Sequence, residues 1–148
     1  MLDGFRFQHP IEVRFADLDA LRHINNAVFL TYMESARIAY WLAVTERSGL
    51  GALDMILART EIDYRSPVLF GESLVVGVRC ASLKRSSFVM EFRVLERAAG
   101  RLVAEARKTL VHYDFKAGKS LPLPAEIRRQ LKTQDPDLTE EGPREVIS

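Results

Sequence analysis

The fold is decided by residues 26–47, which read NAVFLTYMESARIAYWLAVTER and contain neither glycine nor proline. Large apolar side chains occur on all sides of the helix that this segment predicts, so we expect a helix that is buried on most sides. Ala36, Ala39 and Ala43 recur at spacings of three and four and would give a smooth strip where a sheet can approach closely. Asn25 or Asn26 is a suitable N-terminal cap, and Ser48-Gly49 is expected to end the helix.

The segments on either side of this helix have the patterns of strands. Most of them alternate apolar and polar residues with period two, and one is rich in valine; they are residues 11–15, 56–64, 74–83, 88–94 and 102–113. A short amphipathic helix over residues 125–131 follows the last strand. Strands grouped after one helix favour an α+β domain, with an antiparallel sheet curled around the central helix. The exposed edges of such a sheet favour pairing with a second copy of the chain.

Composition excludes several classes of protein. The chain has 148 residues, of which 47% are hydrophobic and 28% charged, so it suits one packed domain. A net charge of +1 argues against a strongly basic nucleic-acid module. The single cysteine, Cys80, rules out an internal disulfide and most thiolate metal sites. No apolar run approaches the roughly 20 residues of a membrane span, and Met1–Gly4 does not begin a signal peptide. We therefore expect a soluble, cytoplasmic protein.

The end of the chain differs in composition from the rest. Residues 132–148 contain five acidic and two basic residues, together with two prolines, a glycine and few large apolar side chains. We therefore expect the folded domain to comprise residues 1–131 and residues 132–148 to form a mobile acidic tail.

The most unusual local sequence is the segment 17–26, DLDALRHINN, between the first strand and the long helix. It holds two carboxylates, one imidazole and two amides. One interpretation is a capping loop with solvated aspartates. The other is a catalytic loop, because a helix N-terminus offers free N–H groups and a positive dipole end to a developing oxyanion, and a nearby carboxylate can act as base or nucleophile.

Three motifs in this part of the chain resemble one known family. Val13–Asp19 (VRFADLD), His23–Ala27 (HINNA) and Tyr32–Arg37 (YMESAR) are similar to the signature of hotdog-fold acyl-CoA thioesterases, in particular the 4-hydroxybenzoyl-CoA thioesterase-like subgroup. The similarity continues through Ile62–Pro67 and Lys84–Phe88 and covers roughly residues 8–115. The resemblance implies a hotdog fold that hydrolyses an acyl-CoA thioester to a free acid and coenzyme A.

The resemblance also implies a role for individual residues. Asp19, the second acid of the pair, would be the general base or nucleophile, and the backbone N–H near Asn26 would polarise the thioester carbonyl. His23 and Asn25 would line the pocket or orient water. The residues expected to contact the phosphates and pantetheine of coenzyme A are Lys84, Arg85 and Ser86. No metal or redox cofactor is implied, and two active sites would lie at the subunit interface of a homodimer or homotetramer.

Several alternatives remain open at this stage. The acyl carrier is either coenzyme A or an acyl carrier protein, because both are acidic. A non-catalytic acyl-CoA-binding module with the same fold is a second possibility. Glu34 is a candidate second carboxylate, although an ion pair with Arg37 is the simpler interpretation. The family usually has glycine where this chain has Arg22, so either the loop differs or this side chain reaches toward the substrate.

Overall fold

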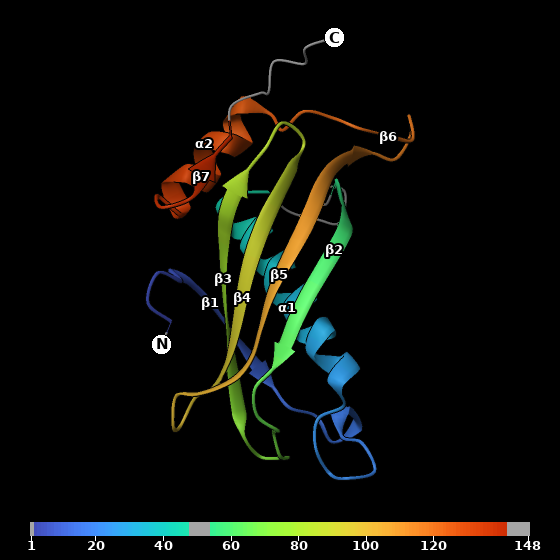
Figure 1. Ribbon diagram of the computed structural model, residues 1–148, viewed down its shortest axis with the longest axis vertical. Coiled ribbons are helices and arrows are strands. Elements are labelled where there is room, and N and C mark those ends of the chain that lie inside the picture. The colour runs from blue at the N-terminus through green and yellow to red at the C-terminus, as the bar shows by residue number, and fades with distance from the viewer. Residues whose placement is uncertain (1, 48–53, 142–148) are drawn as a thin grey trace.

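The computed structural model describes residues 2–47 and 54–141 and has one sheet, whose long strands are all antiparallel, packed against a long helix (Figure 1). The long strands are ordered β1-β3-β4-β5-β2, and two short strands pair with β5 and β3. The elements are β1 (Phe7–Glu12), the 3-10 turn η1 (Phe15–Asp17), α1 (Asn26–Val44), β2 (Met55–Tyr64), β3 (Ser73–Leu83), β4 (Ser87–Glu96), β5 (Arg101–Asp114), β6 (Lys119–Ser120), α2 (Ala125–Gln134) and β7 (Thr139–Glu140). The predicted α+β class and antiparallel sheet are confirmed.

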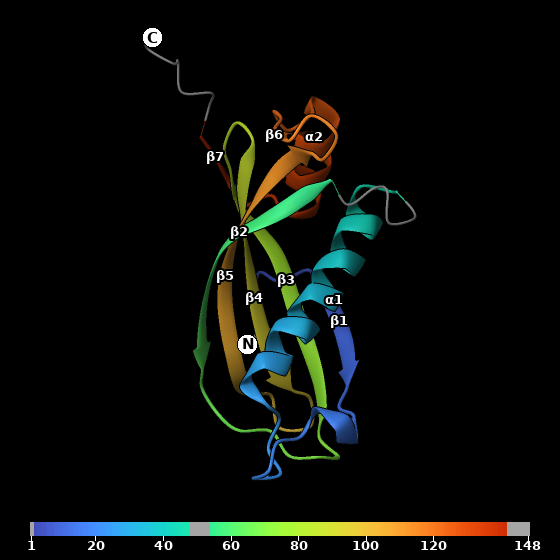
Figure 2. The same ribbon diagram turned by 90° about the vertical axis from the view of Figure 1, so that its right-hand side faces the viewer.

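Helix α1 runs along one face of the sheet, as Figure 2 shows. The side chains that it buries are Phe29, Tyr32, Met33, Ala36, Tyr40 and Trp41. The expectation of burial on most sides is wrong for a single chain, because the sheet covers only one face and Leu30 and Glu34 remain exposed. The expected alanine strip is also incomplete, since Ala36 is buried but Ala43 is exposed. The expected end at Ser48-Gly49 lies outside the described residues. No helix among the described residues is long and apolar enough to cross a membrane.

Two strands differ from the sequence expectation. The first strand lies at residues 7–12, not 11–15, and residues 15–17 form a turn. The physical reason is Asp17, whose carboxylate accepts the backbone N–H of Arg14 at 3.0 Å and so draws the chain out of the extended conformation. Strand β2 does not bury the continuous apolar face that its alternation predicts, because it lies at an edge of the sheet and leaves Ile56 and Leu57 exposed.

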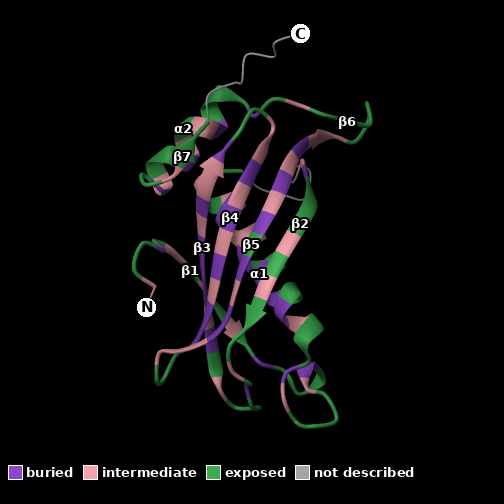
Figure 3. Ribbon diagram, in the orientation of Figure 1, coloured by how far each residue is buried: buried purple, intermediate pink, exposed green. Residues whose placement is uncertain are grey.

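The boundary expected at residue 131 falls inside helix α2, which continues to Gln134. This helix buries Ile127 and Leu131 at one end of the sheet (Figure 3). Asp135 is also buried, and β7 pairs with Ser82 and Leu83 of β3. Residues 132–141 are therefore part of the folded domain, because buried contacts outweigh their polar composition. The remainder of the expected tail, residues 142–148, lies outside the described residues.

Candidate active site

The segment between η1 and α1 is a hydrogen-bonded loop at one end of the sheet. The N–H of Asp19 donates to the carbonyl of His23 at 2.8 Å, and the N–H of Arg22 donates back to the carbonyl of Asp19 at 3.0 Å. The loop is tied to the segment after β2, because the N–H of Ile24 donates to the carbonyl of Val68 at 3.0 Å. These bonds give Asp19 a defined position in the loop that precedes α1.

Asp17 supports this loop through both its side chain and its backbone. Its Oδ2 accepts the hydroxyl of Tyr32 at 2.6 Å, and its Oδ1 accepts the guanidinium of Arg14 at 2.7 Å. The backbone carbonyl of Asp17 accepts the N–H of Asn25 at 2.9 Å. Burial alone would raise the pKa of Asp17, but the hydrogen bonds from Arg14 and Tyr32 hold that pKa below its usual value. Asp17 is therefore a charged, fully engaged support of the loop.

Asp19 differs from Asp17 because its carboxylate is exposed and makes hydrogen bonds within its own loop. Its Oδ1 accepts the N–H of Leu21 at 2.8 Å and that of His23 at 3.2 Å. The residue lines an open pocket of about 550 Å³. The other lining residues are Phe15, Leu18, Arg22, Leu69 and Phe70. A carboxylate in an apolar pocket that opens to solvent is placed to meet a substrate, unlike the buried Asp17.

The N-terminus of α1 lies next to this carboxylate in the chain. Asn25 is the cap, and its Oδ1 accepts the N–H of Ala27 at 3.0 Å. Tyr64 of β2 donates its hydroxyl to the carbonyl of Asn26 at 2.9 Å, which links the helix start to the edge of the sheet. The first N–H groups of a helix have no intrahelical acceptor and form its positive end. Asp19, His23, Asn25 and Asn26 are thus brought together in one loop and helix start.

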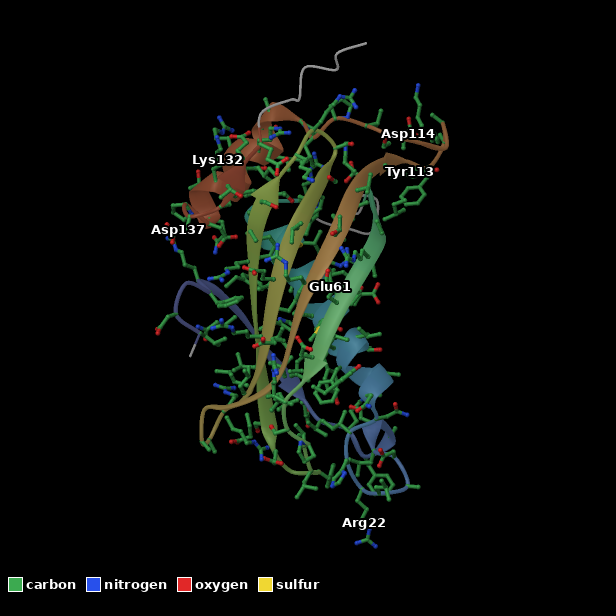
Figure 4. All side chains as sticks on the ribbon, viewed as in Figure 1. Arg22, Glu61, Tyr113, Asp114, Lys132 and Asp137 are labelled. Carbon is green, nitrogen blue, oxygen red and sulfur yellow. The ribbon has the colours of Figure 1, made fainter. Side chains whose placement is uncertain are left out.

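Arg22 has a left-handed backbone conformation, with φ of 63°. This is the conformation that glycine adopts without steric cost, so the loop keeps it despite the larger residue. The side chain lies at the outer rim of the pocket, at the lower end of the molecule in Figure 4.

The three residues predicted to contact coenzyme A lie elsewhere. Lys84, Arg85 and Ser86 form the hairpin between β3 and β4, at the end of the sheet opposite to the Asp19 loop (Figure 1). The 11 residues of β3 separate the two ends, and a rise of about 3.3 Å per residue gives roughly 35 Å. Within one chain, the structure does not bring the two halves of the predicted site together.

The other candidates have local partners. Glu34 pairs with Arg37 at 3.5 Å as an i, i+3 ion pair, in which the Glu34 side chain is exposed and the Arg37 side chain is only 12% exposed. The apolar lining supplied by Phe15, Leu69 and Phe70 was not predicted from the sequence. A signal for it was present, since Leu69 and Phe70 are consecutive apolar residues directly before the turn at Gly71, outside the strands and helices. Within residues 2–47 and 54–141, no cluster of three or more His, Cys, Asp or Glu side chains could hold a metal ion.

A sequence profile of the thioesterase-like superfamily matches residues 13–131. The chain belongs to this superfamily. Among curated proteins, it is similar to the long-chain acyl-CoA thioesterase FadM of Escherichia coli K12, with 28% identity over 130 residues that cover 84% of this chain and 96% of the relative. The resemblance recognised in the motifs is therefore confirmed.

Solved structures of thioesterases have the same fold. A thioesterase from Thermus thermophilus, complexed with coenzyme A and zinc, is 39% identical and superposes with a TM-score of 0.79 over 90% of this chain and 97% of that one. The 1,4-dihydroxy-2-naphthoyl-CoA thioesterase Slr0204 from Synechocystis is 21% identical, with a TM-score of 0.76 over 84% of this chain and 94% of that one. Membership of the thioesterase-like superfamily and these neighbours confirm the hotdog fold.

Proposed function

We propose that this chain hydrolyses an acyl-CoA thioester to a free carboxylic acid and coenzyme A. The observation that carries the proposal is the exposed carboxylate of Asp19, held by backbone N–H groups of its own loop in an apolar pocket, on the segment that leads into α1. The names of the relatives support it, since the long-chain enzyme from Escherichia coli acts on acyl-CoA and the structure from Thermus thermophilus contains coenzyme A.

In this proposal Asp19 either attacks the thioester carbonyl or takes a proton from an attacking water. Negative charge develops on the carbonyl oxygen, and the N–H groups near Asn26 stabilise it at the positive end of the helix. The carbon–sulfur bond breaks, and the departing thiolate is protonated to give free coenzyme A. If an anhydride with Asp19 forms first, water hydrolyses it to the acid and restores the carboxylate. His23 and Asn25, which follow Asp19 in the same loop, do not line the pocket, and in this proposal they orient the water.

We propose further that two copies of the chain are needed to bind coenzyme A. Strand β2 is a ten-residue edge with Ile56 and Leu57 exposed, which suits pairing with a second copy. An antiparallel pair of β2 strands, related by a two-fold axis, would bring the Asp19 loop of one protomer toward the partner hairpin. Lys84, Arg85 and Ser86 of that hairpin would then contact the phosphates and pantetheine. A homodimer meets this requirement, and a homotetramer can contain the same pair.

The test of the chemistry is thiol release from a panel of acyl-CoA donors by the unchanged chain and by Asp19→Ala. We expect turnover that falls by about 10²- to 10⁴-fold in the variant, because the base or nucleophile is lost. Equal turnover would contradict the role of Asp19. Turnover on acyl carrier protein alone would favour that carrier, and tight acyl-CoA binding without thiol release would favour a binding module. A cytoplasmic location stays a prediction that fractionation of the native cells can test.

The shared site has a sharper test in mixed dimers. Asp19→Ala and the double variant Lys84→Ala, Arg85→Ala are each expected to be weakly active. When the two are denatured together and refolded, a dimer with one of each has one site with an intact Asp19 and an intact partner hairpin. We expect recovery of about a quarter of the unchanged activity, by the arithmetic of random pairing of closed two-fold dimers. Recovery of none would contradict sites shared between protomers.

A further inference from the structure

The pocket beside Asp19 has an apolar wall that the proposed chemistry does not use. It is lined mainly by large apolar side chains that the chain leaves open to solvent. Phe15 is 78% exposed and Phe70 is 57% exposed, and their rings meet edge to face with centroids 6.0 Å apart. Leu69 is half exposed beside them. A contiguous cluster of exposed apolar side chains of this kind is typical of a binding surface.

Two separate loops hold this surface in place. Phe15 belongs to η1, which the carboxylate of Asp17 fixes through Arg14. Leu69 and Phe70 lie on the segment after β2, where the N–H of Leu69 donates to the carboxylate of Glu72 at 2.8 Å. The backbone of His23 also forms a β-bridge with Leu69, so this surface and the Asp19 loop are joined. The volume of about 550 Å³ lies within the range of about 300 to 1,000 Å³ typical of small-molecule sites.

Arg22 completes the wall of the pocket under conformational strain. It is one of two non-glycine residues with positive φ in the described chain, at 63°, and Glu46 is the other, at 55°. Strain of this kind persists where the surroundings enforce it, and it concentrates at functional sites. The aliphatic stem of an arginine can cover apolar surface while its guanidinium stays in water. Figure 4 shows Arg22 directed outward at the end of the molecule, in agreement with this arrangement.

We propose that the pocket of Phe15, Leu69 and Phe70 binds the apolar body of the acyl group, and that Arg22 walls this pocket and so sets acyl selectivity. The proposal rests on the proposed thioesterase function, because Asp19 lines the same pocket and would face the thioester carbonyl. The class of substrate is an acyl group with a bulky apolar body, aryl or long alkyl, rather than acetyl or another short chain.

The first experiment measures kcat/KM for a bulky apolar acyl-CoA and for acetyl-CoA, below the micellar concentration of the donors. We expect Phe70→Ala to lower the ratio of the two values by about tenfold or more, mainly through KM for the bulky donor. Phe115→Ala is the matched control, since Phe115 is also exposed and paired edge to face, with Tyr113 at 5.2 Å, but does not line the pocket. We expect it to leave the ratio unchanged.

The second experiment separates the effect of the Arg22 side chain on the pocket from the effect of its strained backbone conformation. We expect Arg22→Gly to fold at an equal or slightly higher Tm, because glycine accepts the positive φ, and to lose selectivity between the donors by several-fold. Arg22→Met, which keeps an apolar stem without the charge, is expected to retain selectivity. Glu46→Gly is the control for strain and should change Tm in the same direction as Arg22→Gly with no effect on selectivity.

Each outcome bears on either the pocket or the proposed function. Turnover with an unchanged ratio in both Phe70→Ala and Arg22→Gly would overturn the pocket proposal and leave the thioesterase function standing. If Arg22→Met lost as much selectivity as Arg22→Gly, the apolar stem of Arg22 would not be the wall of the pocket, and the effect would be assigned to the charge. No turnover by the unchanged chain with any donor would overturn the proposed function and the pocket proposal with it.

Discussion

Two tyrosines of α1, Tyr32 and Tyr40, each donate a hydrogen bond to a buried aspartate. The pKa of one aspartate is nevertheless lowered, whereas the pKa of the other is raised. Tyr32 contacts Asp17 at 2.6 Å near the helix start, and Tyr40 contacts Asp135 at 2.5 Å near the helix end. The guanidinium of Arg14 keeps the pKa of Asp17 below its usual value. Burial raises the pKa of Asp135, although Tyr40 and the N–H of Cys80 donate to it.

The difference between the two ends is the number of strong donors. Both carboxylate oxygens of Asp17 are hydrogen bonded, including two bonds from the Arg14 guanidinium at 2.7 and 3.1 Å. At Asp135 one oxygen accepts both hydrogen bonds, and the other is buried with no partner among the described residues. A charged carboxylate therefore organises the loop that holds Asp19, whereas Asp135 anchors the end of α2 at a desolvation cost. Substitution by asparagine, which keeps the shape and removes the charge, separates the two cases.

The largest effect is expected from Asp17→Asn. The new amide NH₂ or carbonyl cannot satisfy Arg14 and Tyr32 together, so we expect a loss of about 2 to 3 kcal/mol in the free energy of unfolding. Turnover should also fall, because the loop that positions Asp19 loses its support. Urea denaturation and thiol release measure the two effects. Tyr32→Phe removes only one donor, and a larger loss in Tyr32→Phe than in Asp17→Asn would contradict the assigned importance of Arg14.

A buried cation extends the comparison to the middle of the sheet. Lys108 of β5 is 3% exposed, and burial together with nearby Arg37 lowers its pKa to about 8. We expect Lys108→Met to raise the free energy of unfolding at pH 7 by about 1 to 2 kcal/mol, since the charge no longer has to be desolvated. Lys119→Met, at an exposed position, is the control and should have little effect. A destabilised Lys108→Met would mean that its charge is satisfied in the folded protein.

The pH dependence of that gain has a definite sign. The folded pKa of Lys108 is about 8 and the usual value is 10.5, so between these values the unfolded chain binds more protons and this residue makes stability rise with pH. The advantage of Lys108→Met over the unchanged chain should therefore shrink from pH 8 to 10.5. Denaturation of both proteins at matched pH isolates the effect from Cys80, whose pKa is raised to about 12 and which acts in the same pH range. An advantage that stays constant with pH would contradict the assignment.

The smallest effect is expected from Asp135→Asn. Its carbonyl can accept from both Tyr40 and the N–H of Cys80, while its NH₂ replaces the oxygen without a partner. We expect the free energy of unfolding at pH 7 to be unchanged or higher by up to about 1 kcal/mol. A loss as large as that of Asp17→Asn would remove the contrast between the two ends.

Lowering the pH should reduce the effects of both substitutions on the free energy of unfolding, which are a gain for Asp135→Asn and a deficit for Asp17→Asn. The folded pKa of Asp135 is raised, so its destabilising charge is fully present only above that pKa and is gone below the usual value of 3.8. The gain of Asp135→Asn should therefore disappear as pH falls toward 3.8. Asp17 has a lowered pKa, so its stabilisation is complete above 3.8 and is lost as pH falls through the folded value. The deficit of Asp17→Asn should persist to lower pH, which denaturation at pH 3 to 7 tests.

The class of fold and the chemistry of one loop could be predicted from local sequence. Residues 26–47 lack helix breakers, and the side chain of Asn25 can accept an N–H of the helix that begins directly after it. Helix and cap are therefore local properties of the sequence. The motif around Asp19 and His23 is likewise a short stretch of chain, and its carboxylate, cap and helix start stay together in the fold. Such short-range patterns can be recognised in the sequence because residues that are close in the chain stay close in the folded structure.

The contacts between distant segments depend instead on the tertiary structure. The pairing of β1 with β3 and the bridge from His23 to Leu69 bring Phe15 and Phe70 into contact, although 55 residues separate them in the numbering. The same sheet separates Lys84 from Asp19 by the length of β3, and it buries Asp135 in a segment whose composition suggests a tail. Which distant segments become neighbours in the sheet depends on the sum of many contacts across the whole chain, so no single local pattern encodes it.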